Sequence, residues 1–352
     1  MSRRACRNPG RSLTCGHERV DRSLLPKWTV RDRHAGLRSI VGASARSGVD
    51  DAGGARGLVV GLVAVAVVPG RRTMSETTQA LGSVQKTLLL PLWGRAVESR
   101  KRSPLLVDPT AVEIVGKLDY DFSRIAARIH PITRLAWIAR AIHIDQTLRE
   151  FLARSPDATI VNIGCGLDTT FERVDNGRLA WVDLDLPDVI ELRRRLVPDG
   201  PRRRMVAGSV LEAEWLRDVR PDHGLMLVAA GVLYYLEEPQ VRALLKRLAA
   251  VFPGRELLFD ACSRRGARIA NRRVIEQGGM DPSAALKWGI DRPAELPGWD
   301  PRIEVMGAYR LFHGIAGRLP WKARLGALVS DAMNIMSIVH LRFRALKEGV
   351  PR

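Results

Sequence analysis

The sequence has few cysteines and no apolar segment long enough to cross a membrane. Its four cysteines, Cys6, Cys15, Cys165 and Cys262, are scattered among 352 residues, and no pair has the spacing of a metal site. We therefore expect no disulfide and no metal, as is typical of proteins in the reducing cytoplasm. The most apolar run, Leu58–Val68, is too short for a membrane-spanning helix, which needs about 20 residues. Its distance from the N-terminus argues against a signal peptide, so we predict no membrane partner.

The chain also lacks an even distribution of charge. Its net charge is +18, with 56 Lys and Arg against 38 Asp and Glu, which by itself suggests a nucleic-acid partner. Residues 1–73 hold 14 of the basic and 5 of the acidic residues, so one fifth of the chain contributes half of the excess. This segment is rich in Arg, Gly and Ala, without a periodic apolar pattern before residue 57. We predict that residues 1–73 are a disordered or non-native leader, with a membrane-anchoring or targeting role as the alternative.

A second basic cluster, RRRLVPDGPRRR, lies at Arg193–Arg204. Positive charge suits the C-terminal end of a helix, so we interpret this stretch as a helix end followed by a solvated loop. A nucleic-acid site would need interleaved aromatic or glycine residues and a second basic face. We find neither, and therefore predict no nucleic-acid partner.

From Met74 onward the apolar pattern is that of a folded protein. Residues 74–157 predict an N-terminal helical cap, because apolar residues recur there at helical spacing. Residues 158–352 alternate short apolar strands with helices, which predicts an α/β domain with a mostly parallel sheet covered on both faces. The expected helices span residues 81–98, 109–115, 133–152, 187–196, 214–219, 239–252 and 264–277. The expected strands span residues 158–163, 179–184, 203–207, 225–230, 256–261, 302–306 and 337–343.

A glycine-rich turn, VNIGCGLDTT, includes the end of the first expected strand. The dinucleotide fingerprint G-x-G-x-x-G requires a third glycine. Here Thr169 occupies that position, and no phosphate-loop lysine follows. Asp168, two residues after Gly166, would repel a pyrophosphate but suits a positively charged cofactor without phosphate, such as S-adenosylmethionine. An NAD-dependent oxidoreductase is therefore the weaker alternative.

A carboxylate at the end of the second expected strand supports the same cofactor. Asp185, in WVDLDLP, lies 19 residues after Gly166, which fits adjacent strands of one unit. It can accept hydrogen bonds from both hydroxyls of a ribose. The third strand ends before Ser209 and Val210, whose loop would lie beside the adenine. The fourth leads into small residues at Ala230, and open α/β sheets bind ligands at such carboxyl ends.

As a set, these motifs resemble the leucine carboxyl methyltransferase superfamily, and within it the branch of tetracenomycin polyketide O-methyltransferases. The resemblance extends from about Ser83 to Phe343. It implies a class I methyltransferase fold, which is a Rossmann-like sheet of seven strands with the last one antiparallel. It also implies a cytoplasmic O-methyltransferase that uses S-adenosylmethionine. The matching segments include SVQKTLLLPLWGRAVES, ARAIHIDQTLREFL, IGCGLDTTFER, WVDLDLPDVIELRRRL, VAAGVLYYLEEPQVRALLKRL and FPGRELLFDACS.

The resemblance implies roles for individual residues. Arg140 would pair with the methionyl carboxylate of the cofactor, since a guanidinium can grip a carboxylate through two parallel hydrogen bonds. Gly164 and Gly166 would line the methionyl part, and Asp185 would hold the ribose. Ala230 stands where the protein-phosphatase branch has a glutamate. This departure argues for a small-molecule acceptor rather than the C-terminus of a phosphatase.

The sequence leaves the catalytic residues open. Methyl transfer to a carboxylate needs no base, whereas transfer to a hydroxyl is helped by one. Tyr234 and Tyr235, at a strand end, and His143 are the candidates for a catalytic role. His130 and His313 are further histidines to consider as a base.

The acceptor pocket is less well defined by sequence. We expect an insertion of about residues 280–331 to help cap it, and Trp288, Trp299 and Trp321 either line it or pack in the core. A nucleic-acid methyltransferase usually has an Asn/Asp-Pro-Pro-Tyr motif after the fourth strand, which is lacking here. The acceptor itself, carboxyl or hydroxyl chemistry, and the oligomeric state are not determined. A protein that binds the cofactor without catalysis is the remaining alternative.

Overall fold

The computed structural model describes residues 76–77, 81–82 and 84–345, so the leader expected at residues 1–73 lies outside the described residues. A seven-stranded sheet, in the order β5-β4-β3-β6-β7-β9-β8, is the centre of the described part. Its strands are β3 (Thr159–Ile163), β4 (Ala180–Asp185), β5 (Arg203–Ala207), β6 (Leu225–Ala229), β7 (Glu256–Cys262), β8 (Ile303–Arg310) and β9 (Met336–Phe343).

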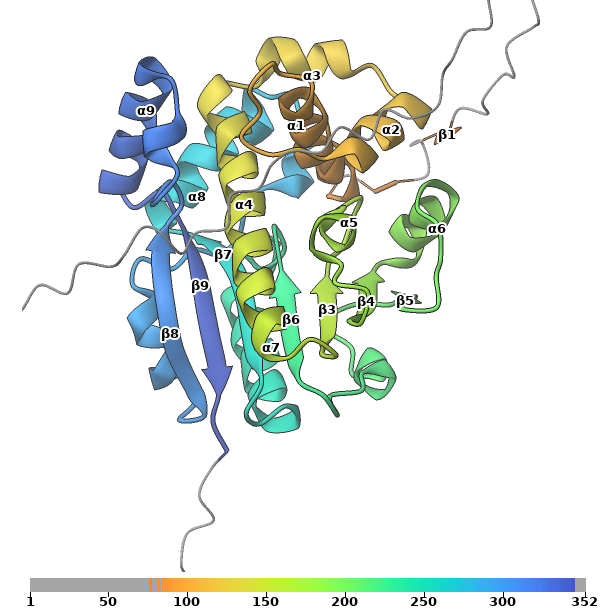
Figure 1. The fold of residues 1–352 in the computed structure, drawn as a ribbon. Helices are drawn as coiled ribbons and strands as arrows, with labels where there is room; N and C mark the ends of the chain where they lie inside the picture. The colour runs from red at the N-terminus through yellow and green to blue at the C-terminus, as the bar shows by residue number, and fades with distance from the viewer. Residues whose placement is uncertain (1–75, 78–80, 83, 346–352) are drawn as a thin grey trace, which may run out of the picture. The chain divides into compact units, whose positions relative to one another are not determined.

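The strand directions confirm the expected fold class. Strands β3 to β7 pair in parallel, whereas β9 is antiparallel to both of its neighbours, β7 and β8. Figure 1 shows β9 pointing against the other strands. The sheet is therefore the seven-stranded, mostly parallel sheet with an antiparallel last strand that class I methyltransferases share.

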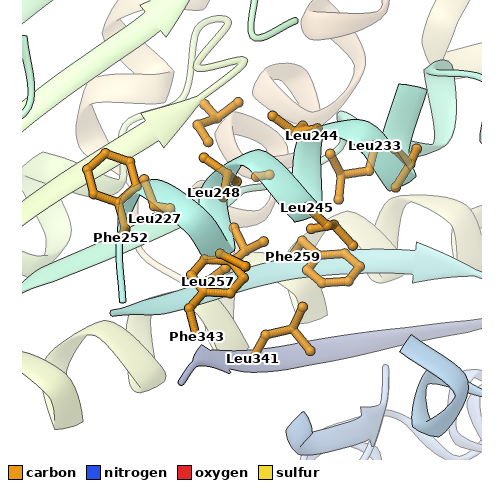
Figure 2. Packing of buried hydrophobic residues seen from close by; sticks show 14 of the residues in the cluster. Leu227, Leu233, Leu244, Leu245, Leu248, Phe252, Leu257, Phe259, Leu341 and Phe343 are labelled. Atoms are coloured by element: carbon orange, nitrogen blue, oxygen red, sulfur yellow. The ribbon is translucent and has the colours of Figure 1, made fainter. Parts of the chain in front are cut away.

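Alternating side chains of the strands fill a core on each face of the sheet. In β6, Leu225 and Leu227 belong to one cluster, whereas Met226 and Val228 belong to the other. The first cluster packs against α7 (Glu238–Val251), whose leucines lie against β7 and β9 in Figure 2. The second packs against α4 (Pro131–Arg154). Both faces are thus covered, which is why these strands read as continuous apolar runs.

Helices of the N-terminal region lie over the carboxyl ends of the parallel strands (Figure 1). A short pairing of β1 (Glu76–Thr77) with β2 (Leu118–Asp119) adds a second, two-stranded sheet there. The helices of this cap, besides α4, are η2 (Gln85–Leu88), α1 (Leu89–Ser99), α2 (Pro109–Lys117) and α3 (Phe122–Arg128). The other helices longer than one turn are α5 (Thr170–Val174), α6 (Pro187–Leu196), η3 (Glu214–Asp218), α8 (Arg264–Ala270), η5 (Asn271–Glu276), η7 (Pro293–Gly298) and α9 (Trp321–Ala332).

Three of the expected helices are not wholly α-helical in the structure, and the strand expected at 302–306 extends as β8 to Arg310. The helix expected at 81–98 is α-helical only from Leu89, which places Pro91 in the first turn, where its missing N–H costs nothing. The helix expected at 264–277 ends as α-helix at Ala270 and continues as a π-helix. The one expected at 214–219 is a 3₁₀ helix that ends at Asp218.

Candidate functional site

A cavity of about 640 Å³ lies at the carboxyl ends of the parallel strands. Its volume is in the range of small-molecule and cofactor sites. The cap, the glycine-rich turn and the region before β9 all contribute to its lining. It brings together all eight residues expected to bind the cofactor, which are Arg140, Gly164, Gly166, Asp168, Asp185, Ser209, Val210 and Ala230.

The turn after β3 needs glycine at two positions. Gly164 has φ +62° and Gly166 has φ +48°, a region that side chains disfavour. A Cβ at Gly164 would lie 2.3 Å from Val232 Cγ2, and one at Gly166 would lie 3.1 Å from Leu88 Cβ. The glycines therefore let the turn pass close to both the cap and the loop after β6.

Buried arginines hold three consecutive carbonyl groups of this turn. Arg193 of α6 donates from Nη1 to Gly166 O (2.8 Å) and from Nη2 to Asp168 O (2.8 Å). Arg95 of α1 donates from Nη2 to the intervening Leu167 O (3.0 Å). Both side chains are buried, and each has a buried carboxylate partner. The conformation of the turn is thus fixed by α1, which precedes it in the chain, and by α6, which follows it.

These partners correct the interpretation of the second basic cluster. Arg193 is completely buried and pairs with Asp183 at 3.0 Å, and Arg203 pairs with the same carboxylate at 2.8 Å. Neither belongs to a solvated helix end or loop. Arg194 and Arg195, exposed in the last turn of α6, do fit that expectation, whereas Arg204 is exposed but lies in β5. Sequence alone did not separate the two groups, because the carboxylate partner comes from a neighbouring strand.

The two acidic residues of the site have opposite electrostatics. Burial alone would raise the pKa of Asp168, but the guanidinium groups of Arg95 and Arg173 hold it well below its ordinary value. Asp168 is therefore ionised. Burial raises the pKa of Asp185 to about 6, although its carboxylate accepts hydrogen bonds from Gly166 N (2.7 Å) and Leu186 N (2.8 Å).

Arg140 belongs to a cluster at the ends of β6 and β7. Its Nη1 lies 2.9 Å from Asp260 Oδ2 and 3.1 Å from the hydroxyl of Tyr234. Asp260 is fully buried and also accepts a hydrogen bond from Gly231 N at 2.6 Å. Burial opposes the charge of Arg140, but the pair with Asp260 raises its pKa above the ordinary value, so the guanidinium stays charged.

Two further residues of the site, Asp260 and Arg95, were not predicted from the sequence. The available signal for Asp260 was an acidic residue in the middle of the apolar strand ELLFDAC. The other acid of this strand, Glu256, lies at its start. A Cβ at Gly231 would lie 2.7 Å from Arg140 Nη1, so this glycine also keeps space for the arginine.

Only some of the candidate catalytic residues line the cavity. Tyr234 and Tyr235 line the cavity, and Tyr235 donates to Thr87 Oγ1 at 3.3 Å. Burial raises the pKa of both phenols, so both stay protonated near neutral pH. His143 is not among the lining residues: its Nε2 lies 2.9 Å from Leu311 O. Of the other histidines, His130 lines the cavity and His313 does not.

Part of the cavity lining is an apolar wall. The tryptophan that lines it is Trp137 of α4, whereas Trp288 is in the core, Trp299 packs against that core and Trp321 is 74% exposed. The insertion expected at 280–331 contributes to the lining, as does the region after it. The wall residues include Leu90, Pro91, Trp137, Val274, Leu311, Phe312 and Val329.

The described part of the chain offers neither a metal site nor a helix that could span a membrane. No cluster of three or more His, Cys, Asp or Glu side chains is placed to hold a metal ion there. Among the described helices, none has the length and apolar character needed to cross a membrane.

Comparisons with known proteins agree with this geometry. Residues 89–249 match the family model for leucine carboxyl methyltransferase. The tetracenomycin polyketide synthesis O-methyltransferase of Streptomyces glaucescens is 33% identical over 77% of this chain and 97% of its own length. An S-adenosylmethionine-dependent methyltransferase of Gibberella zeae is 28% identical over 75% of this chain and 95% of its own.

A solved structure supports the fold independently. A DUF574 family protein from Streptomyces avermitilis superposes with a TM-score of 0.50 over 73% of this chain and 97% of its own, at 13% identity. Its likeness concerns the fold alone, whereas the family model matches residues 89–249, a range that holds part of the cavity lining. The chain belongs to the leucine carboxyl methyltransferase family and is a methyltransferase with S-adenosylmethionine as its cofactor.

Proposed function

We propose that this chain is a cytoplasmic O-methyltransferase that modifies a carboxyl or hydroxyl group of a small, apolar, polyketide-like molecule. The observation that carries the proposal is the continuity of one cavity, from the glycine-rich turn to the apolar wall of the cap. The printed role of the Streptomyces glaucescens relative, in tetracenomycin polyketide synthesis, supports this kind of acceptor.

The residues of the turn and strand ends fit the cofactor. Ionised Asp168 suits its positive charge and would oppose a pyrophosphate, which disfavours a nicotinamide dinucleotide. Each oxygen of Asp185 already accepts one backbone hydrogen bond and has a further lone pair for a ribose hydroxyl. Arg140 would pair with the methionyl carboxylate, and Ser209 with Val210 would flank the adenine.

Bound S-adenosylmethionine supplies a methyl group on a positively charged sulfur. The task of the chain is then to align an acceptor oxygen with that group and to exclude water. The apolar wall, with Trp137 on α4 and Leu90 on α1, would hold a flat acceptor. Tyr234 and Tyr235 keep their protons, so neither would act as the base that removes a proton from the acceptor oxygen.

The structure changes the choice of base. His143 lies outside the cavity lining, which leaves His130 as the histidine that borders it. His130 Nδ1 accepts from Ile132 N at 3.3 Å, as the N-cap of α4. We infer that the acceptor ionises without a strong base, as a carboxylic acid or an acidic phenol does.

Two measurements test the proposal in sequence. Calorimetric titration of the full chain should give micromolar affinity for S-adenosylmethionine and no heat with NADH. Release of S-adenosylhomocysteine should then be followed with a panel of aromatic acids, phenols and aliphatic alcohols. Turnover of the first two classes supports the proposal. Tight cofactor binding without turnover of any panel member favours a protein that binds the cofactor without catalysis. NADH binding would mean that the glycine-rich turn accepts a nicotinamide dinucleotide, which contradicts the proposal.

A further inference from the structure

Helix α9 has its large apolar residues on the outside. A surface helix of a globular protein normally turns such residues toward the core. Here the inward positions are small: Ala327 is fully buried, and Ala323, Gly326 and Ser330 are partly buried. The exposed fractions of the large residues are 74% for Trp321, 62% for Leu325, 50% for Leu328 and 50% for Val329.

The exposed residues form one stripe with basic edges. Positions 321, 325 and 328 have the i, i+4, i+7 spacing, so they share one face of the helix. Lys322 and Arg324 flank this face on either side and are also exposed. A helix with an apolar stripe, a tryptophan and basic edges has the pattern of helices that lie in a membrane interface.

A second basic surface borders the cavity described above, which α9 also lines. The segment α8–η5 lines the cavity through Ile269 and Arg273, and α9 lines it through Val329. Exposed arginines of α8–η5 add to the positive charge: these are Arg265, Arg268, Arg272 and Arg273. Within residues 84–345, none of these four forms an ion pair with a described carboxylate, and neither do Lys322 and Arg324.

We propose that the stripe of α9 and the arginines of α8–η5 dock this protein on an anionic lipid surface. Each Lys or Arg near such a surface adds electrostatic attraction, and the stripe supplies apolar residues that enter the headgroup boundary. A second copy of the chain fits the surface poorly, because a two-fold contact would bring like charges together. The docking revises the expectation that no membrane takes part, and it does not depend on the methyl-transfer reaction.

The test is co-sedimentation of the full chain with lipid vesicles. We expect binding to vesicles of phosphatidylcholine with phosphatidylglycerol and at least tenfold weaker binding to phosphatidylcholine alone. The double variant Leu325→Ser/Leu328→Ser should weaken binding to the anionic vesicles at least tenfold. The double variant Lys322→Glu/Arg324→Glu should do the same, and its loss should grow as the salt concentration is lowered, since wild-type attraction is then least screened.

Two control variants of the same full chain test whether the residues before 76 or the net charge alone account for vesicle binding. Val251→Ser removes an apolar residue that is 46% exposed on α7, and Arg217→Glu/Lys246→Glu makes the same charge change on other elements. Both controls should bind vesicles like the wild type, and all variants should keep the circular dichroism of the folded chain. Vesicle binding that the α9 variants leave unchanged, or no vesicle binding at all, overturns the proposal. So does a dimer in solution that the α9 variants dissociate.

Discussion

The cofactor side and the acceptor side of the cavity are built by different physical means. The cofactor side is a polar turn held from behind by buried ion pairs, such as Arg193 with Asp183. The acceptor side is an apolar wall that the cap and the segments around β8 and β9 provide. Charged partners with fixed geometry give one defined conformation, whereas apolar contacts accept different shapes. On the proposed function, cofactor binding should therefore be sensitive to the loss of single polar atoms, and acceptor binding to the volume of the side chains in the wall.

The largest effect is expected on removing the charge behind the turn. Arg193→Leu leaves two buried carbonyls without a donor and weakens the pairing of Asp183, so the free energy of unfolding should fall by about 3–5 kcal/mol. Chemical denaturation monitored by circular dichroism measures this. The control is Arg195→Leu, which removes an exposed partner of Glu191 and should cost at most about 1 kcal/mol. Equal losses in the two variants would contradict the structural role of Arg193.

A methyl group in the turn should harm cofactor binding more than folding alone explains. Gly164→Ala places a Cβ 2.3 Å from Val232 Cγ2, so the turn or Val232 must move. Gly177→Ala is the control, because Gly177 also has positive φ (+80°) but has no atom within 4 Å of the added Cβ. Both variants should lose about 1–2 kcal/mol of stability from backbone strain. Only Gly164→Ala should weaken S-adenosylmethionine binding by more than tenfold, and calorimetry distinguishes them.

Asp185 should make cofactor affinity depend on pH. Asp185→Ala should weaken binding at pH 8 at least tenfold, or about 1.4 kcal/mol. The folded pKa of about 6 is raised above the ordinary value, so the carboxyl of the free protein becomes protonated as pH falls through 6. The loss caused by the substitution should therefore shrink at pH 5, where the wild type has a weaker acceptor. Titrations at both pH values check this, and unchanged affinity at pH 8 would remove Asp185 from the ribose site.

The same pKa predicts the sign of a stability change. Because the folded pKa is raised, the carboxyl of Asp185 contributes stability below the pKa of the unfolded chain, and this contribution is lost as pH rises through about 6. Relative to Asp185→Asn, the wild type without cofactor should therefore become less stable between pH 4 and pH 7. Parallel unfolding curves at these pH values measure the difference.

The two tyrosines allow a smaller test of the division between the sides. Tyr234→Phe removes a hydrogen bond to Arg140, and Tyr235→Phe removes one to Thr87 in η2. Each change should cost about 1 kcal/mol or somewhat more, a roughly fivefold to tenfold effect. We expect Tyr234→Phe to act on cofactor affinity and Tyr235→Phe to act on the KM or kcat for the acceptor. Equal effects of both on cofactor affinity would show that the sides are not separate.

The smallest effect is expected at the N-terminus. The described lining of the cavity begins at Val84, so deleting residues 1–73 should leave the cofactor affinity and the unfolding midpoint unchanged. Calorimetry and thermal unfolding of the shortened chain measure both. A chain that aggregates or loses cofactor binding after the deletion would show that the leader has a structural role.

Local patterns in the sequence predicted which residues of the glycine-rich turn and the strand ends come together, and their role in cofactor binding stays a prediction. The spacing of Gly164, Gly166 and Asp185 follows from short-range turn and strand geometry, and the structure places all three in the cavity. Asp260 and Arg95 were missed because their partners are far away in the chain: Arg140 precedes Asp260 by 120 residues, and Arg95 precedes Leu167 by 72. A residue pattern contains no direct information on such pairings.

The acceptor side was harder to predict for a related reason. Aromatic residues can pack in the core or line a pocket, and the sequence does not distinguish these environments. Trp137, on a helix expected to form the cap, lines the cavity, whereas Trp288 lies in the core. Whether a tryptophan lines the cavity or packs in the core is decided by how the elements pack together, which depends on the whole fold.

The arginine contacts behind the turn have an evolutionary consequence. Arg193 and Arg95 reach the turn from α6 and α1 without using any atom of the apolar wall formed by Val274 or Val329. Mutations at Val274 or Val329, which lie outside α1 and α6, therefore leave the carbonyl contacts of the turn in place. Descendants of such a protein can acquire new acceptors through drift in the wall while inheriting the same cofactor.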